Sequence, residues 1–267
     1  MQKIIWSIFF LLCFSGNILQ AFGSTEKNTE NDIRDIVFVL DNSGSMKKND
    51  PAFLTKQVVR DFLQVLEKET RIAIVIFDKD VKLQIPLTQI GRSNSAKIFL
   101  EALEKINFQG QYTDLPAAIE TAVYELKTNG RKESARYIIF LTDGIVDTGN
   151  TELDIERTKW LKNDLAMESK KLGIKIFGIA FTNNADFHLI QSLAIQTDGE
   201  YFKALKAKDI AGVFAQIKET MRTKPTSSTT DKQSSIDATT LSKDVNKVQT
   251  VPKPQTTPRK PNTSLSV

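Results

Sequence analysis

The sequence predicts an α/β fold: a doubly wound, mainly parallel six-stranded sheet with one antiparallel edge strand and helices on both faces. Short runs of apolar and β-branched residues alternate with longer amphipathic segments, which is the pattern of a parallel sheet covered on both sides. One connection, residues 78–80, is too short to cross a face of the sheet, so it joins an antiparallel pair of strands.

Six segments are predicted to be strands. The first two are continuous apolar runs, as strands buried on both faces require. The third contains Pro86, which favours the edge of the sheet because proline has no amide hydrogen to donate. In chain order the segments are Asp35–Leu40, Arg71–Phe77, Val81–Leu87, Tyr137–Leu141, Lys175–Phe181 and Tyr201–Leu205.

Six helices are predicted between and after these strands. In the first, Asp50 is the expected N-cap and Pro51 the first helical residue. Gly173 is expected to end the fourth helix in the C′ position. The predicted helices cover residues 51–66, 92–105, 115–126, 152–171, 186–196 and 210–221.

The N-terminal segment has the features of an export signal. Lys3 provides a positive charge, residues 4–14 form an apolar run, and Ala21-Phe22-Gly23 offers small residues for cleavage after Gly23. We therefore expect residues 1–23 to be a signal peptide of a secreted or periplasmic protein. An uncleaved N-terminal anchor is the alternative, because residues 4–22 are just long enough to span a bilayer. The only cysteine, Cys13, lies in this segment, so the processed chain has no thiol chemistry and no cysteine zinc site.

Positive charge is concentrated at the C-terminus. The chain carries a net charge of +4, and residues 224–267 alone hold seven lysines and arginines against three aspartates. The part between signal and tail therefore has no basic surplus, and we expect no nucleic-acid partner. Residues 224–267 are rich in Ser, Thr, Pro and Lys and are predicted to be a disordered basic tail. Its charge would allow contact with an anionic membrane or cell-wall surface. Residues 24–34 are predicted to be a linker, and residues 35–223 a monomeric domain.

Oxygen-bearing side chains gather at the ends of three predicted elements. Asp41, Ser43 and Ser45 follow the first strand at alternate positions, so their oxygens can converge in an extended loop. Thr113 lies in the loop before the helix at 115, and Asp143 follows the fourth strand. Each motif alone could be a turn or a helix cap. Together they predict a metal site, because hard cations such as Mg²⁺ prefer oxygen ligands.

The pattern Asp41-x-Ser43-x-Ser45, followed by Thr113 and then Asp143, resembles the metal-ion-dependent adhesion site of the von Willebrand factor type A domain family. The resemblance covers roughly residues 32–223. It implies the sheet order 3-2-1-4-5-6, so that the first and fourth strands are neighbours at a topological switch point, where ligands bind. It also implies that these five residues hold Mg²⁺ or Mn²⁺, and that the ion binds an Asp or Glu carboxylate of a partner protein.

The sequence favours a binding module over two alternatives. In one, the metal only stabilises the loops of a structural interaction domain; in the other, the ion serves a hydrolase. Support for an enzyme is small: His188 is the sole histidine, and neither a Gly-x-Ser-x-Gly elbow nor a Walker loop follows a strand. We therefore expect no catalytic activity. Asp78, Asp80 and Asp147 are interpreted as solvated turn residues that at most lie near the site.

Overall fold

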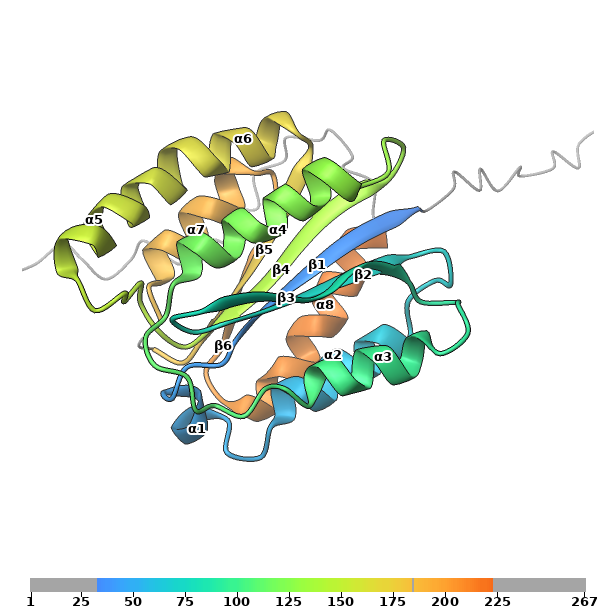
Figure 1. Ribbon diagram of the computed structural model, residues 1–267, viewed down its shortest axis with the longest axis horizontal. Helices are drawn as coiled ribbons and strands as arrows, with labels where there is room; N and C mark the ends of the chain where they lie inside the picture. Colours follow the sequence, from blue (N-terminus) through green and yellow to red (C-terminus); the bar gives the residue numbers. More distant parts are fainter. Residues whose placement is uncertain (1–32, 184, 223–267) are drawn as a thin grey trace, which may run out of the picture. The chain divides into compact units, whose positions relative to one another are not determined.

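The computed structural model describes residues 33–183 and 185–222, which form a six-stranded sheet between two layers of helices (Figure 1). The strand order is β3-β2-β1-β4-β5-β6. Neighbouring strands are parallel except β2 and β3, which are antiparallel. The predicted fold class is therefore confirmed. The predicted signal peptide, residues 24–32 of the linker and the basic tail lie outside the described residues.

The strands fall close to the predicted segments. Every residue of β1 is buried, and the apolar stretch 36–40 within it is what the centre of a covered sheet requires. The predicted linker is one residue too long: Arg34 is the first residue of β1, because its backbone pairs with Ala135 of β4. The strands are β1 (Arg34–Asp41), β2 (Arg71–Phe77), β3 (Val81–Gln89), β4 (Ala135–Thr142), β5 (Ile174–Phe181) and β6 (Tyr201–Ala204).

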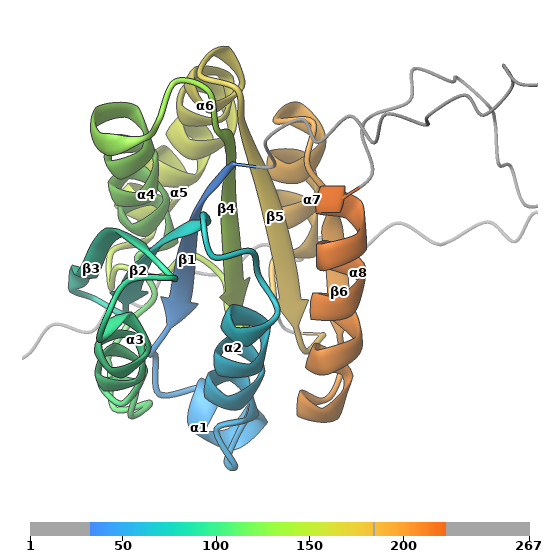
Figure 2. The same cartoon turned by 90° about the vertical axis from the view of Figure 1, so that its right-hand side faces the viewer.

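The helices lie on opposite faces of the sheet (Figure 2), and among the described helices none has the length and apolar character of a bilayer span. One face is covered by α2 (Leu54–Gln64), α3 (Ser95–Leu103) and α8 (Ile210–Arg222). The other is covered by α4 (Leu115–Asn129), α6 (Ala166–Lys171) and α7 (Phe187–Gln196), with α5 (Thr151–Trp160) leading through a π-helical turn, Leu161–Leu165, into α6. The apolar face predicted for the last helix is buried in α8, at Ile210, Val213, Phe214, Ile217 and Met221.

The first predicted helix differs from the structure. A short helix, α1 (Met46–Asn49), was not predicted, and α2 begins at Leu54 rather than at Pro51. Asp50 still caps α2, but from outside it: its carboxylate accepts hydrogen bonds from the amides of Leu54 at 2.7 Å and Thr55 at 2.9 Å. The predicted N-cap is therefore wrong in position, because Phe53 occupies the N-cap of α2, although the Asp50 carboxylate does accept hydrogen bonds from the first turn of the helix.

A buried ion cluster fixes the start of β1. It lies at the N-terminal end of the strand, whereas the predicted metal site lies at the carboxyl end. The Asp35 carboxylate accepts hydrogen bonds from Arg71 at 2.5 Å, from Arg131 at 2.7 Å and from the Ser134 hydroxyl at 2.9 Å. Burial on its own would raise the pKa of Asp35, but these hydrogen bonds outweigh it and the pKa is lowered. Asp35 is therefore held as a carboxylate that joins β1 to β2 and to the loop before β4.

Candidate metal centre

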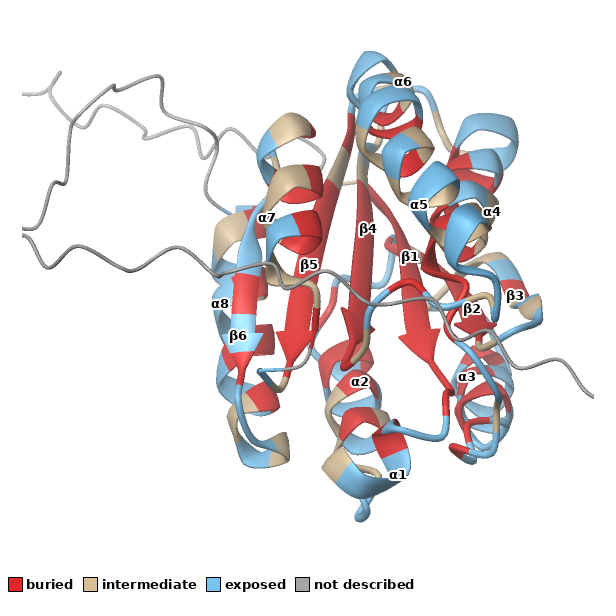
Figure 3. Ribbon diagram, turned by 90° about the vertical axis from the view of Figure 1, so that its left-hand side faces the viewer, coloured by how far each residue is buried: buried red, intermediate tan, exposed pale blue. Residues whose placement is uncertain are grey.

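The carboxyl ends of β1 and β4 place two buried carboxylates side by side. Asp41 is the last residue of β1, Asp143 follows β4, and the two strands are neighbours in the sheet (Figure 3). Their exposed fractions are 2% and 1%. The strand order reverses between β1 and β4, which leaves a crevice at this edge in doubly wound sheets.

Two serine hydroxyls join these carboxylates. The Oγ atoms of Ser43 and Ser45 lie 3.0 Å apart, and the Ser45 hydroxyl donates to Asp143 Oδ1 at 2.7 Å. The turn between strand and serines is closed by the Ser43 amide, which donates to Asp41 Oδ1 at 2.8 Å. Four of the five predicted residues therefore form one connected cluster of oxygens.

Thr113 reaches the same place from the loop between α3 and α4. Its backbone pairs in both directions with Asp147, with N–O distances of 2.7 and 3.1 Å. Its hydroxyl oxygen lies 3.6 Å from the position that a Cβ on Gly144 would occupy, so it lies beside the residue that follows Asp143. The structure thus places Thr113, which is buried, beside Gly144, the residue that follows Asp143 in the cluster.

Two further side chains orient the carboxylates and were not identified from the sequence. The Thr142 hydroxyl donates to Asp41 Oδ2 at 2.6 Å, and the Asn49 amide donates to Asp143 Oδ2 at 2.5 Å. Asn49 lies on α1, the helix that the sequence analysis missed (Figure 2). Thr142 could have been suspected only from its place beside Asp143, since strand alternation does not show that its hydroxyl crosses to β1.

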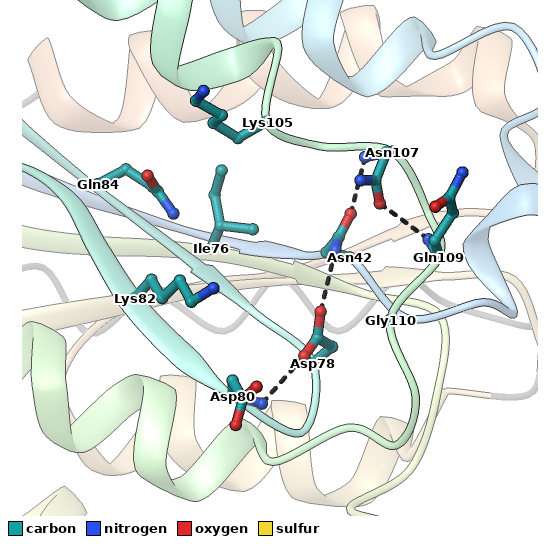
Figure 4. Close-up of a pocket in the computed structure, with 10 residues that line it drawn as sticks. All are labelled: Asn42, Ile76, Asp78, Asp80, Lys82, Gln84, Lys105, Asn107, Gln109 and Gly110. Carbon is teal, nitrogen blue, oxygen red and sulfur yellow. Dashed lines mark hydrogen bonds between the residues drawn. The ribbon is translucent and has the colours of Figure 1, made fainter.

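Asn42 holds the loop of Thr113 against the end of β1 (Figure 4). Its carbonyl oxygen accepts hydrogen bonds from the amides of Asn107 at 2.8 Å and Phe108 at 2.9 Å. Its amide group donates to Asp78 Oδ2 at 3.0 Å. Gly110 passes so close to Asp78 that a Cβ there would lie 2.3 Å from the Asp78 side chain, which only glycine allows. Asp78, interpreted from the sequence as a solvated turn residue, is therefore half-buried and part of this support.

A polar hollow of about 500 Å³ opens beside Asn42 (Figure 4). Lys82 and Lys105 contribute positive charges to its lining, and Asp78 and Asp80 contribute negative ones. Its remaining lining consists of Asn42, Ile76, Gln84, Asn107, Gln109 and Gly110. The hollow therefore offers hydrogen bonds and charges of both signs rather than an apolar surface.

Burial raises the pKa of both carboxyl groups at the centre. For Asp41, burial outweighs the hydrogen bonds from Ser43 and Thr142, the charge of Asp143 adds to it, and the pKa is raised to about 6. For Asp143, burial outweighs the hydrogen bonds from Asn49 and Ser45. Two buried carboxylates that repel each other are suited to share a cation. Within residues 33–183 and 185–222 no three His, Cys, Asp or Glu side chains gather to hold a metal, so an ion here would also depend on hydroxyl and water oxygens. The donors present fit a hard divalent cation.

We expect Asn42→Ala to loosen the loop that carries Thr113. The substitution leaves the amides of Asn107 and Phe108 without their acceptor, which should lower the free energy of unfolding by about 1–3 kcal/mol. Urea unfolding in chelator measures this change. Asn163→Ala, at an exposed asparagine of the π-helical turn, is the control and should have almost no effect. Equal stabilities for the two variants would show that Asn42 does not support the loop.

Comparison with known proteins finds the same architecture elsewhere. The von Willebrand factor type A domain model matches residues 35–216. Human Matrilin-1 is 23% identical over 181 residues, which are 66% of this chain and 34% of that protein, so the chain spans about a third of the length of such relatives.

Two solved structures share the fold. A von Willebrand factor type A protein from Catenulispora acidiphila matches with a TM-score of 0.59 and 15% identity, over 70% of this chain and 42% of that one. Proximal thread matrix protein 1 from the mussel byssus, solved with a zinc-occupied MIDAS motif, matches with a TM-score of 0.54 and 21% identity, over 70% of this chain and 46% of that one.

Proposed function

The chain belongs to the von Willebrand factor type A family, and on that premise we propose that it is an exported protein-binding module for adhesion or assembly, whose metal ion bridges to an acidic residue of a partner. One observation carries the proposal: two buried carboxylates, Asp41 and Asp143, meet serine hydroxyls at the carboxyl ends of β1 and β4. That arrangement provides oxygen ligands from the ends of two neighbouring strands.

In this proposal each side chain of the centre has a distinct part. Ser43, Ser45 and Thr113 would bind the ion through their hydroxyls, and Asp41 and Asp143 would bind it directly or through water. A bound ion would supply an electron-poor position that accepts a partner's Asp or Glu, since three of its ligands are neutral. Two supporting side chains would keep the carboxylates in place: Thr142 donates a hydrogen bond to Asp41 Oδ2, and Asn49 donates one to Asp143 Oδ2.

The native ion is expected to be Mg²⁺ or Mn²⁺. An all-oxygen donor set that retains water suits these ions better than Zn²⁺, which favours nitrogen and sulfur ligands. Calorimetry of the full chain with each of the three ions should show one site per chain for Mg²⁺ or Mn²⁺. Zinc is a required arm because the mussel protein binds zinc at its motif. Tight Zn²⁺ binding without any response to Mg²⁺ or Mn²⁺ would contradict this assignment.

Acidic pH is expected to weaken Mg²⁺ binding and to stabilise the metal-free fold. Burial raises the folded pKa of Asp41 from 3.8 to about 6. In chelator, this group therefore contributes stability that is fully present below about pH 4 and is lost as the pH rises through about 6. The ion needs the carboxylate, so a proton competes with it, and the Kd for Mg²⁺ should rise about tenfold for each pH unit below about 6.

Two series of measurements from about pH 5 to about pH 8 check these trends. Urea unfolding in chelator reports the stability of the metal-free chain, and calorimetry reports the affinity for Mg²⁺. An affinity for Mg²⁺ that stays constant across this range would contradict a buried Asp41 carboxylate at the ion.

Affinity capture separates this function from the structural interaction domain, and an assay of phosphate-ester turnover separates it from the hydrolase. The full chain is used as bait on the source organism's envelope proteins in Mg²⁺, and the column is then washed with chelator. Release of the partner by chelator is expected. A partner that stays bound in chelator would favour the structural interaction domain, and Mg²⁺-dependent turnover of a phosphate ester would favour the hydrolase. Export and the contact of residues 224–267 with an anionic surface stay predictions from the sequence.

A further inference from the structure

Two large apolar side chains are exposed on the loops that carry Thr113 and Asp143. Tyr112 precedes Thr113 and is 40% exposed, and Ile145, two residues after Asp143, is 59% exposed. The next residue, Val146, is buried in the core, so Ile145 is not needed to fill it. Backbone pairing between Thr113 and Asp147 joins the two loops. The exposed pair therefore borders the metal centre on connected loops.

Tyr112 is held in place rather than left free. Its φ of +63° is uncommon for a residue with a side chain, and such backbone conformations gather at functional sites. Its ring lies against the backbone of Gly149, where a Cβ would come within 2.7 Å of Tyr112 Cε1. Lys79 Nζ lies 6.0 Å from the centre of the ring. An aromatic ring fixed in this way needs little further ordering when it binds a partner.

Charged and apolar side chains both occur on the loops at this end of the sheet. Asp78 and Asp80 of the turn between β2 and β3 line the polar hollow, whereas Lys79 between them lies over the ring of Tyr112. A partner chain whose acidic residue sits at the ion would reach the loops of Thr113 and Asp143, on which Tyr112 and Ile145 are exposed. We call these two side chains the apolar rim.

We propose that the apolar rim selects partners in which the metal-binding Asp or Glu is followed or preceded by a large aliphatic or aromatic residue. The inference rests on the proposed function, because the acidic residue must first be placed at the ion. Burial of the neighbouring side chain against Tyr112 and Ile145 would then supply affinity that a carboxylate alone lacks. Single exposed apolar residues occur on any protein surface. The chain provides controls for that explanation in Ile155 and Ile195, which are 52% and 61% exposed on α5 and α7.

A peptide array tests the rim. Immobilised pentapeptides with a central Glu and every pair of flanking residues are probed with the full chain in Mg²⁺ and in chelator. We expect Mg²⁺-dependent binding that is strongest when a flank is Leu, Ile, Met, Phe or Tyr. Kd values for the best peptide are then measured in solution. Ile145→Ser and Tyr112→Ala should each weaken it about tenfold, whereas Ile155→Ser and Ile195→Ser should leave it unchanged. All four variants should bind Mg²⁺ as the unmodified chain does.

The outcomes separate the rim from the function on which it rests. Mg²⁺-dependent binding without preference for an apolar flank, or equal Kd values for the rim and control variants, would overturn the rim and leave the metal-bridging function intact. Absence of Mg²⁺-dependent binding to every Glu peptide would count against both. Sedimentation velocity in chelator measures whether the chain associates with itself. Self-association that disappears in Ile145→Ser would assign the rim to a second copy of this chain instead.

Discussion

Asp143→Ala is expected to abolish Mg²⁺ binding and leave the domain folded. The Asp143 carboxylate accepts hydrogen bonds from Ser45, which is exposed, and from Asn49, which is half-buried, so both donors can turn to water when it is removed. Loss of one of two neighbouring carboxylates also removes a repulsion, and the metal-free variant should be slightly more stable than the unmodified chain. Any stability gained from the ion, about 2.7 kcal/mol at a hundredfold excess over Kd, should vanish.

Thermal melts in Mg²⁺ and in chelator, together with capture of the partner, measure these effects. Asp147→Ala is the matched control, because Asp147 is exposed in the same region and its carboxylate accepts a hydrogen bond from the backbone amide of the nearby, exposed Gly149. The control should keep both the Mg²⁺-induced rise in melting temperature and the capture. If Asp143→Ala still captures the partner at full strength, a metal-independent surface carries the interaction and metal bridging is wrong.

Asp35→Asn is expected to cause the largest loss of stability among the substitutions considered. The variant keeps the shape of the side chain but leaves Arg71 and Arg131 without their counter-charge. Removal of one partner from a fully buried ion pair costs about 3–5 kcal/mol. Both arginines are about a fifth exposed, so we expect about 2–4 kcal/mol at neutral pH.

The effect should depend on pH in a defined direction. The folded pKa of Asp35 is lowered, so its contribution is present above the unfolded pKa and is lost as the pH falls through the folded value. The difference between Asp35→Asn and the unmodified chain should therefore shrink in acid. Urea unfolding at neutral and acidic pH measures it, with Asp61→Asn as an exposed control expected to change little. A variant as stable as the unmodified chain at neutral pH would show that the cluster adds no net stability.

The strands of this fold were predictable because buried strands consist mainly of apolar residues, which can be recognised in a short stretch of sequence. β1, β2 and β5 each contain a run of at least five residues without a polar side chain, and the structure places all three strands in the interior of the sheet. Pro86 correctly indicated that β3 lies at the edge. The convergence of Asp41 and Asp143 followed from a general rule, since the carboxyl ends of neighbouring parallel strands meet at one edge.

The supporting residues were not predictable, because their partners are distant in sequence. Asn42 binds Asn107 and Phe108, 65 and 66 residues away, and Thr142 binds Asp41 across 101 residues. No local period reports such contacts. The short helix α1 has four residues, fewer than two turns, so no amphipathic pattern can reveal it. The sequence therefore indicated which oxygen-bearing residues follow the strands, but not how their side chains are oriented.

The length of β1 sets the distance between Asp35 at one end of the domain and Asp41 at the other. Asp35 fixes one end in the ion cluster and Asp41 lies at the proposed metal centre, about 20 Å away at the usual rise of a strand. Strand β2 holds this length in register, with Asp35 opposite Arg71 and Asp41 opposite Phe77. Insertion of a single residue between the two aspartates would move Asp41 by about 3.3 Å and turn it to the opposite face of the sheet. The number of residues between them is thus as much a part of the proposed metal centre as its oxygens, and a designer who grafts this centre onto another sheet must copy the spacing along with the proposed ligands.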